Sequence, residues 1–359
     1  MKRLLLSTLA LLVMLSACNQ NYSTPTATDD RELFATPTAT STEVPVTPTN
    51  TPIPVTLLQR GVNFGNMLES PNEGEWGLFV QEEYFDLVKE AGFDFVRLPV
   101  RWNSHSEQDY PYTIDPAFFA RVDEIVGWAQ ARNLAIIVDF HHYEEMMTDP
   151  WSHKDRYLGI SKQVAEHYKG YPSNVLFELL NEPNTTLDAQ LWNQYLVEAL
   201  AIVRASNPTR DVVIGPVHWN AYDWLSTLDV PNDEHLIVTF HYYSPFQFTH
   251  QGAEWAGDEA QKWLGTEWGS DTEKAEITDH FDLVADWAKR HGNVRILLGE
   301  FGAYSKAPQG SRALWTKFIR EQAEAHGFAW AYWEFGSGFG VYDPNVKLWR
   351  QDLLKALIP

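Results

Sequence analysis

Residues 116–140 read PAFFARVDEIVGWAQARNLAIIVDF, and this stretch sets the pattern for the whole fold. In its first part, apolar residues recur three and four positions apart, as they do on one face of an amphipathic helix. We predict a helix over Pro116–Ala131, with Asp115 as the N-cap and proline in the first turn. The last part, Ala135–Phe140, is almost continuously apolar. That is typical of a strand of a parallel sheet that is buried on both faces.

The same alternation recurs on both sides of this stretch. Helical patterns cover Leu187–Ala205 and Gly310–Ala325, among others. The buried strands are predicted at Arg60–Asn63, Phe95–Leu98, Ala135–Phe140, Val175–Leu180, Val212–Pro216, Leu236–Phe240, Arg295–Gly299 and Phe328–Trp333. Repeated strand–helix units over about 300 residues predict an α/β fold with a single (β/α)8 TIM barrel. An open doubly wound sheet is the alternative. It is disfavoured as a dinucleotide-binding fold because no Gly-rich phosphate turn follows the first strand.

The N-terminal residues differ in composition from the barrel. Lys2 and Arg3 precede a short apolar run that ends in Leu-Ser-Ala-Cys at Cys18. Residues 1–17 are therefore predicted to be a signal peptide, and they resemble that of a bacterial lipoprotein with Cys18 as the lipidated residue. A plain secretory signal is the alternative. Residues 18–55 are predicted to be a disordered linker, since ten Thr and six Pro fall within residues 19–55. The barrel domain is assigned to residues 56–359.

Charge and cysteine content exclude several classes of protein. The chain has 27 Lys and Arg against 48 Asp and Glu, a net charge of −21. Such a chain is repelled by phosphate backbones, so nucleic acid is not an expected partner. Membrane contact is expected only through the lipid anchor, which predicts an extracellular or cell-surface location. Cys18 is the only cysteine, so an intrachain disulfide and a Cys-based metal site are ruled out. A barrel of this size buries its own core, which makes a monomer the default.

Polar side chains gather where the predicted strands end, which is where a barrel carries its active site. A long aromatic segment, residues 241–271, follows the sixth strand, and loops of this length are usually functional. The strand-end candidates are Asn66, Glu69, Arg97, His141, His142, Asn181, Glu182, His241, Tyr243, Glu300, Trp333 and Glu334, with His250 and Trp255 from the long segment.

Two of these residues, Glu182 and Glu300, directly follow apolar runs. Burial raises the pKa of a carboxyl group, and a nearby like charge raises it further. Glycosidic bond cleavage needs such a pair, because one neutral acid protonates the leaving oxygen while one anion faces the oxocarbenium-like carbon. The alternative is that each glutamate forms a structural ion pair.

Neither a metal nor any other cofactor is predicted. Adjacent histidines on a strand point to opposite faces, so His141 and His142 are not expected to bind one ion together. The HExxH spacing is absent from the sequence. A Ser-His-Asp triad is not supported either, because no Gly-x-Ser-x-Gly motif occurs.

Four motifs in order along the chain carry a family resemblance. They are Val-Arg-Leu-Pro at 96–99, Leu-Asn-Glu-Pro at 180–183, His-Tyr-Tyr at 241–243 and Gly-Glu-Phe-Gly at 299–302. From about residue 60 to the C-terminus the chain resembles the retaining glycoside hydrolases of family 5, in clan A. Residues 65–69, 71–74, 141–145, 248–255 and 331–335 look like the thermophilic endoglucanase branch, several members of which accept both β-1,4-glucan and β-1,4-mannan. The resemblance implies a retaining endo-β-1,4-glycanase acting on a β-1,4-linked polysaccharide.

The resemblance also implies a role for each matched residue. Glu182 matches the acid/base and Glu300 the nucleophile. Asn181 would bind the sugar 2-hydroxyl. Arg97 would hold Glu300 ionised, or form an internal salt bridge that orders the barrel, or do both. Tyr243 would orient Glu300, and His241 would line the −1 sugar or support Glu182. Trp333 would be the stacking floor of the −1 subsite rather than a core residue. Sugar contacts farther along the cleft are implied for Asn66, Glu69, His141, His142, His250 and Trp255, although Glu69 could instead pair with a nearby cation.

Other functions remain open at this point. A barrel with aromatic loops could capture polysaccharide at the cell surface without cleaving it, although such a binder would not need two buried glutamates at strand ends. A different retaining activity, such as a xylanase, a β-1,3-glucanase or an exo-acting glucosidase, could use the same barrel. The choice between glucan and mannan depends on hydrogen bonds around C2 of the sugar.

Overall fold

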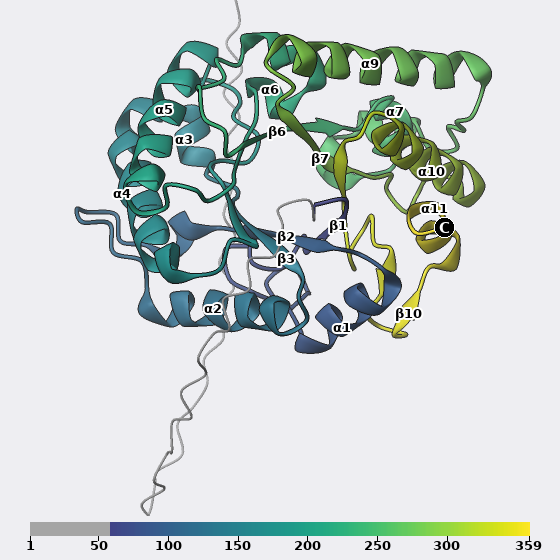
Figure 1. Ribbon diagram of the computed structural model, residues 1–359. Helices are drawn as coiled ribbons and strands as arrows, with labels where there is room; N and C mark the ends of the chain where they lie inside the picture. Colours follow the sequence, from purple (N-terminus) through teal and green to yellow (C-terminus); the bar gives the residue numbers. More distant parts are fainter. Residues whose placement is uncertain (1–57) are drawn as a thin grey trace, which may run out of the picture. The chain divides into compact units, whose positions relative to one another are not determined.

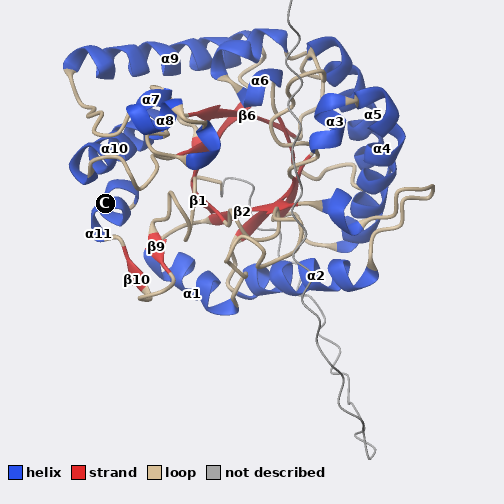
Figure 2. Ribbon diagram, turned by 180° about the vertical axis from the view of Figure 1, so that it is seen from behind, coloured by secondary structure: helices blue, strands red, loops and turns tan. Residues whose placement is uncertain are grey.

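Residues 58–359 are described by the computed structural model, and they form a barrel surrounded by helices (Figures 1 and 2). The predicted signal peptide, Cys18 and the whole predicted linker, residues 18–55, lie outside the described residues. Eight parallel strands pair in chain order and close on each other. They are β1 (Arg60–Asn63), β2 (Phe95–Val100), β3 (Ala135–Phe140), β4 (Val175–Glu178), β5 (Val212–Ile214), β6 (Leu236–Tyr242), β7 (Arg295–Phe301) and β8 (Ala329–Tyr332).

The helices lie outside this ring of strands (Figure 2). They are α1 (Glu82–Ala91), α2 (Pro116–Ala131), α3 (Glu144–Thr148), α4 (Pro150–His167), α5 (Ala189–Ser206), α6 (Val217–Asn220), α7 (Phe246–Thr249), α8 (Glu259–Lys262), α9 (Asp271–Arg290), α10 (Gln309–Ala325) and α11 (Gln351–Leu357). A small hairpin of β9 (Tyr342–Asp343) and β10 (Leu348–Trp349) precedes α11. None of the helices within residues 58–359 has both the length and the apolar character needed to cross a bilayer.

The predicted barrel is confirmed, and the strands differ from expectation only at their ends. The fourth strand ends at Glu178, before Leu180, whereas β6 and β7 each extend two residues past their predicted ends. The helix over Pro116–Ala131 has the predicted bounds, and the Asp115 carboxylate caps it by accepting a hydrogen bond from the Ala117 amide at 2.8 Å. The long segment after β6 contains the short helices α7 and α8.

Side chains inside the barrel form a separate apolar cluster, distinct from the larger core between strands and helices. Its buried members are Phe95, Ala135, Ile137, Leu176, Val213, Ile237, Leu297 and Ala331. Side chains alternate along a strand, so the residue two positions farther on faces the same interior. Two positions after Phe95, Ile137 and Leu176, the residues on β2, β3 and β4 are Arg97, Asp139 and Glu178 respectively. All three are buried. The barrel interior therefore changes from apolar to charged toward the carboxyl ends of the strands.

Candidate active site

A cleft of about 550 Å³ opens at the carboxyl ends of the strands. A second hollow of about 300 Å³ adjoins it, because His142 and Glu182 line both. The structure brings together in the first cleft nearly all the residues that the sequence proposed as touching substrate: Asn66, Glu69, His141, His142, Glu182, Tyr243, His250, Trp255, Glu300 and Trp333. Asn181 lines the second hollow.

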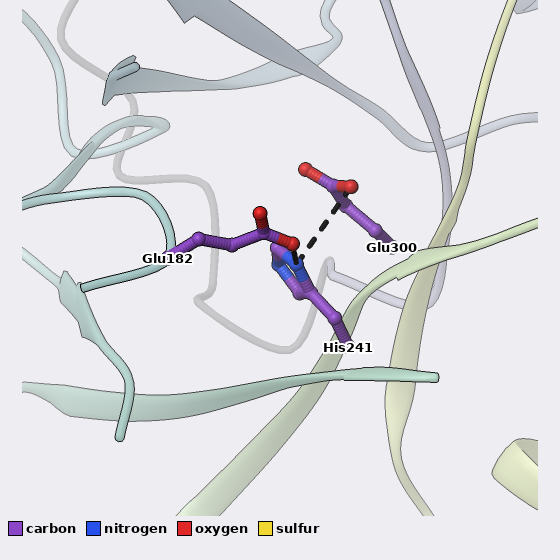
Figure 3. A group of neighbouring side chains, drawn as sticks. All are labelled: Glu182, His241 and Glu300. Carbon is purple, nitrogen blue, oxygen red and sulfur yellow. Dashed lines mark hydrogen bonds and ion pairs between the residues drawn. The ribbon is translucent and has the colours of Figure 1, made fainter. Parts of the chain in front are cut away.

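Glu182 and Glu300 face each other across this cleft (Figure 3). One oxygen of each carboxyl group and one ring nitrogen of His241 all lie within 4.8 Å of one another. Glu300 sits on β7, and its side chain is 6% exposed. Glu182 follows β4 in a left-handed backbone conformation, and its side chain is 25% exposed. Retaining glycosidases carry their two carboxyl groups about 5–5.5 Å apart, whereas inverting enzymes need about 6.5–9.5 Å. The limit of 4.8 Å between these two oxygens fits a retaining pair and lies below the range of an inverting pair.

Arg97 lies behind the pair and is fully buried. Its Nη1 donates to Glu300 Oε1 at 2.8 Å, and its Nε donates to Glu178 at 2.6 Å. It also forms an ion pair with Asp139 at 3.0 Å. The guanidinium group therefore forms ion pairs with three carboxylates at once. Its two roles, ordering the barrel and contacting Glu300, are both present in one network.

Burial is the dominant influence on the two carboxyl groups of the cleft. It raises the pKa of Glu182 to about 8 and the pKa of Glu300 to about 7. His241 and Arg97 oppose the rise at Glu300, and Tyr243 opposes it through a hydrogen bond. Arg97 therefore acts on the Glu300 pKa in the predicted, lowering direction, but burial outweighs it and the net pKa is raised. The reason is that removing the Glu300 carboxylate from water costs more than the nearby charges and the Tyr243 hydrogen bond return. Glu300 still loses its proton before Glu182 does.

His241 and Tyr243 hold the two carboxyl groups in place. The Nδ1 atom of His241 lies 2.7 Å from Glu182 Oε1 and 3.7 Å from Glu300 Oε2. Tyr243 donates its hydroxyl proton to Glu300 Oε2 at 2.9 Å. Burial lowers the pKa of His241 to about 4, so the ring is neutral at neutral pH. Of the two roles proposed for His241, contact with Glu182 is the one the geometry displays.

The same three side chains are the group within residues 58–359 that could converge on a metal ion (Figure 3). Glu182 and His241 are already in hydrogen-bond contact, so a cation would have to replace that bond. The absence of a metal from the reaction remains a prediction.

An aromatic wall borders one side of the pair. The Trp333 indole lies parallel to the His141 ring, with an interplanar angle of 6° and centroids 5.8 Å apart. His141 Nδ1 lies 2.5 Å from Asp139, and its Nε2 faces the Asn181 amide nitrogen at 3.3 Å. The Asn181 amide oxygen accepts from Arg97 at 2.7 Å. The Asn181 side chain is thus oriented from two directions.

The expectation about the two adjacent histidines needs correction. His141 and His142 do not point to opposite faces, since both line the cleft with rings 4.5 Å apart. The reason is that β3 ends at Phe140 and His142 adopts a left-handed conformation. Of the two alternatives for Glu69, the structure shows it lining the cleft, and no ion pair to a cation is found within residues 58–359. It is buried, it accepts hydrogen bonds from the backbone amides of Asn66 and Met67, and burial raises its pKa to about 8. It orders the turn at the cleft wall.

The long segment after β6 contributes His250 and Trp255 to the lining of the cleft. His250 stacks on Phe246 with centroids 4.0 Å apart and is almost buried. Trp255 is 62% exposed and lies edge-on to Tyr304 at 4.8 Å. The long aromatic segment therefore borders the cleft, and its contact with substrate stays a prediction.

Sequence reasoning missed several residues of the site. Trp219 is 51% exposed and lines the second hollow, and Trp76 lines the larger cleft with its ring centroid 5.8 Å from that of His142. Neither follows a strand directly, so neither was sought. Asp139 and Glu178 form the network around Arg97. They could have been found, because each is a single charged residue inside an otherwise apolar strand run.

A barrel cleft with two facing carboxyl groups at this spacing defines a glycosidase-type site. The comparisons agree. The family model described as Cellulase (glycosyl hydrolase family 5) matches residues 57–338. The chain belongs to this family, and it is a glycoside hydrolase.

Individual relatives are similar over most of the barrel. Endoglucanase H of Acetivibrio thermocellus is 38% identical over 292 residues, which are 81% of this chain and 31% of that protein. The chain thus spans about a third of the length of this relative. Cel5A of Thermotoga maritima, solved in complex with mannotriose, is 46% identical, with a TM-score of 0.83 over 84% of this chain and 98% of that one. A Cel5A structure in complex with cellobiose is 47% identical, with the same TM-score of 0.83 and the same coverage, 84% and 98%.

Proposed function

We propose that the protein is a retaining endo-β-1,4-glucanase that works by double displacement. The observation that supports this most strongly is the placement of one Glu182 oxygen and one Glu300 oxygen within 4.8 Å of each other. The names of the relatives, endoglucanases among them, agree with this assignment.

In the first step, Glu300 attacks the anomeric carbon and the bond to the leaving oxygen breaks. Glu182 gives its proton to that oxygen, and a glycosyl–Glu300 ester remains. In the second step, Glu182 takes a proton from water, the water oxygen bonds to the anomeric carbon, and Glu300 is released. The configuration at this carbon is retained. Arg97 and Tyr243, which both contact Glu300, stabilise the carboxylate that attacks and departs.

Internal cleavage needs room for sugar units on both sides of the bond that breaks. The larger cleft carries Trp333, Trp255 and Trp76, while the smaller hollow carries Trp219. Glu182 lines both, so a chain that crosses Glu182 has an aromatic surface in each direction. Indole rings suit the C–H faces of pyranose units. This arrangement favours endo action over exo action, and the paired glutamates favour catalysis over simple capture of polysaccharide.

We further propose that β-1,4-mannan is a second substrate. The Thermotoga maritima enzyme has been solved with mannotriose and with cellobiose, and this chain is similar to it over the whole barrel. Glucose and mannose differ at C2. The residues proposed to meet that position are Asn66, His141, His142 and Trp255, all of which line the larger cleft.

A side-by-side product profile tests these substrate proposals. The full chain is incubated with carboxymethyl cellulose, glucomannan, galactomannan and xylan, and products are measured by reducing-sugar assay and chromatography. Mixed oligosaccharides from glucan at early times support endo-glucanase action. Release of a single small sugar would contradict endo action, and faster cleavage of xylan would contradict the assigned specificity.

We also propose that the enzyme works at the cell surface as a monomer, anchored by a lipid on Cys18. The support is the basic start, the apolar run and the Leu-Ser-Ala-Cys sequence. Labelling of the full chain with a radioactive fatty acid in a bacterial host should occur, and Cys18→Ser should abolish it. Labelling that survives this substitution would contradict the proposal, and size-exclusion chromatography with light scattering tests the monomer.

A further inference from the structure

Behind His241, the chain after β5 adopts an unusual conformation. His218, Trp219 and Asn220 are consecutive non-glycine residues with φ of 63°, 59° and 54°. Left-handed backbone is unfavourable for such residues, and runs of it persist only where the surroundings impose it, often at functional sites. The run lies against the catalytic groups, because the Trp219 amide donates to the Pro183 carbonyl at 3.3 Å and Ala221 forms a bridge with His241.

This run places the Asn220 side chain against the back of His241. Asn220 is fully buried, and its Nδ2 lies 3.4 Å from His241 Nε2. Its Oδ1 has no hydrogen-bond partner among the described residues. The space exists because residue 215 is glycine, since a Cβ there would lie 2.4 Å from Asn220 Oδ1.

We infer that Asn220 is a positioning residue that sets the tautomer of His241 and thereby the orientation of the Glu182 proton. An amide NH2 group can only donate, so Nε2 of the neutral ring accepts and the ring proton resides on Nδ1. Nδ1–H then donates to Glu182 Oε1 across the 2.7 Å contact. The acid proton of Glu182 is consequently left on Oε2, where no His241 lone pair competes with the leaving oxygen for it.

The opposite tautomer would impair the acid. With the proton on Nε2, the Nδ1 lone pair would accept the Glu182 proton instead, and proton transfer to the leaving group would have to break that bond. This inference rests on the proposed function, because it assigns Glu182 as the acid.

Substitution of Asn220 tests the inference through leaving-group dependence. Asn220→Asp offers an acceptor to Nε2 and favours the opposite tautomer, while Asn220→Leu removes the donor at similar volume. For both variants we expect kcat/KM on unactivated cello-oligosaccharides to fall about tenfold or more, a part of the general-acid contribution of about 10²–10⁴. The loss on a dinitrophenyl cellobioside, which needs no acid, should stay within about threefold.

Asn174 provides a matched control. It is also a buried asparagine, its Nδ2 donates to the Leu134 carbonyl at 3.2 Å, and its Oδ1 has no hydrogen-bond partner among the described residues. It lies just before β4, at the opposite end of the barrel from the cleft. Asn174→Asp and Asn174→Leu should change kcat/KM by the same factor on both substrates. Equal effects from the Asn220 variants, or none, would overturn the inference.

A measurement on the unsubstituted protein does not depend on whether the variants fold. The full chain is labelled with [15N]histidine, and the His241 signals are assigned by their loss in His241→Gln. We expect a neutral ring protonated on Nδ1 at pH 7, whereas protonation on Nε2 would overturn the inference. Failure of the unsubstituted enzyme to cleave any β-1,4-glucan would instead overturn the proposed function, and the two failures are therefore distinguishable.

Discussion

Two layers of the barrel interior come from the same strands and have opposite chemistry. The lower layer holds Phe95, Ile137 and Leu176, and the upper layer, two residues farther along β2, β3 and β4, holds Arg97, Asp139 and Glu178. Both layers are buried. Burying apolar side chains stabilises the fold, whereas burying ion pairs costs desolvation that their attraction only partly returns. Side chains only two residues apart on the same strand therefore differ in their contribution. Those of the lower layer stabilise the fold, and those of the upper layer support the catalytic groups.

The largest expected effect comes from the group that the upper layer supports. Glu300→Gln removes the nucleophile, and we expect kcat/KM to fall on the order of 10⁴–10⁶-fold, as when other catalytic nucleophiles are removed. The free energy of unfolding should not fall, because burial already raises the Glu300 pKa and thus disfavours its charge. Initial rates on carboxymethyl cellulose and urea titrations measure the two quantities. A variant that is as stable as the unsubstituted protein and retains a tenth of its activity would contradict the assignment of Glu300 as the nucleophile.

Glu182→Gln should give a smaller and substrate-dependent loss. On unactivated substrates kcat/KM should fall about 10²–10⁴-fold, because the general acid is gone. On an activated aryl glycoside the loss should be much smaller, since that leaving group departs without a proton. If both substrates slowed equally, Glu182 would not be the acid.

The lower layer should respond in the opposite way. Ile137→Ala creates a cavity in the apolar cluster, and we expect the free energy of unfolding to fall by about 2–5 kcal/mol. The variant should keep its kcat/KM within about twofold at a temperature where it is folded. The matched upper-layer variant on the same strand is Asp139→Asn, which should lower kcat/KM more than stability because Asp139 contacts both Arg97 and His141. Equal effects of the two substitutions would remove the distinction between the layers.

The smallest expected effect is that of pH, which distinguishes the protonation states of Glu300 and Glu182. The active form needs Glu300 ionised and Glu182 protonated, and burial raises their pKa values to about 7 and about 8. Activity should therefore fall below about pH 7, where Glu300 gains a proton, and above about pH 8, where Glu182 loses one. The pH profile of kcat/KM measures this, and the two limbs belong to the coupled pair. An optimum near pH 4 would contradict the influence of burial.

The barrel and most of the site could be predicted because each rests on local signals. Continuous apolar runs mark buried parallel strands, and a polar residue just after such a run lies at the carboxyl rim. What escaped prediction depends on backbone geometry beyond the strand. The left-handed turn at His142 brings both histidines into the cleft, and the left-handed run at 218–220 presents Trp219 to the second hollow. No residue pattern marks either turn. The balance at Glu300 between burial, which raises its pKa, and Arg97, which lowers it, also escaped prediction, because it depends on how completely the fold removes the carboxyl group from water.

The most direct test of the account is identification of the residue that carries the sugar between the two steps. The full chain is treated with a dinitrophenyl 2-deoxy-2-fluoro-β-cellobioside, whose good leaving group permits the first step while the fluorine slows the second. Peptide mapping by mass spectrometry should find one fluorocellobiosyl group, attached to Glu300. Attachment to Glu182 or to any other residue, or turnover that releases the α-anomer with no attached sugar, would contradict the account.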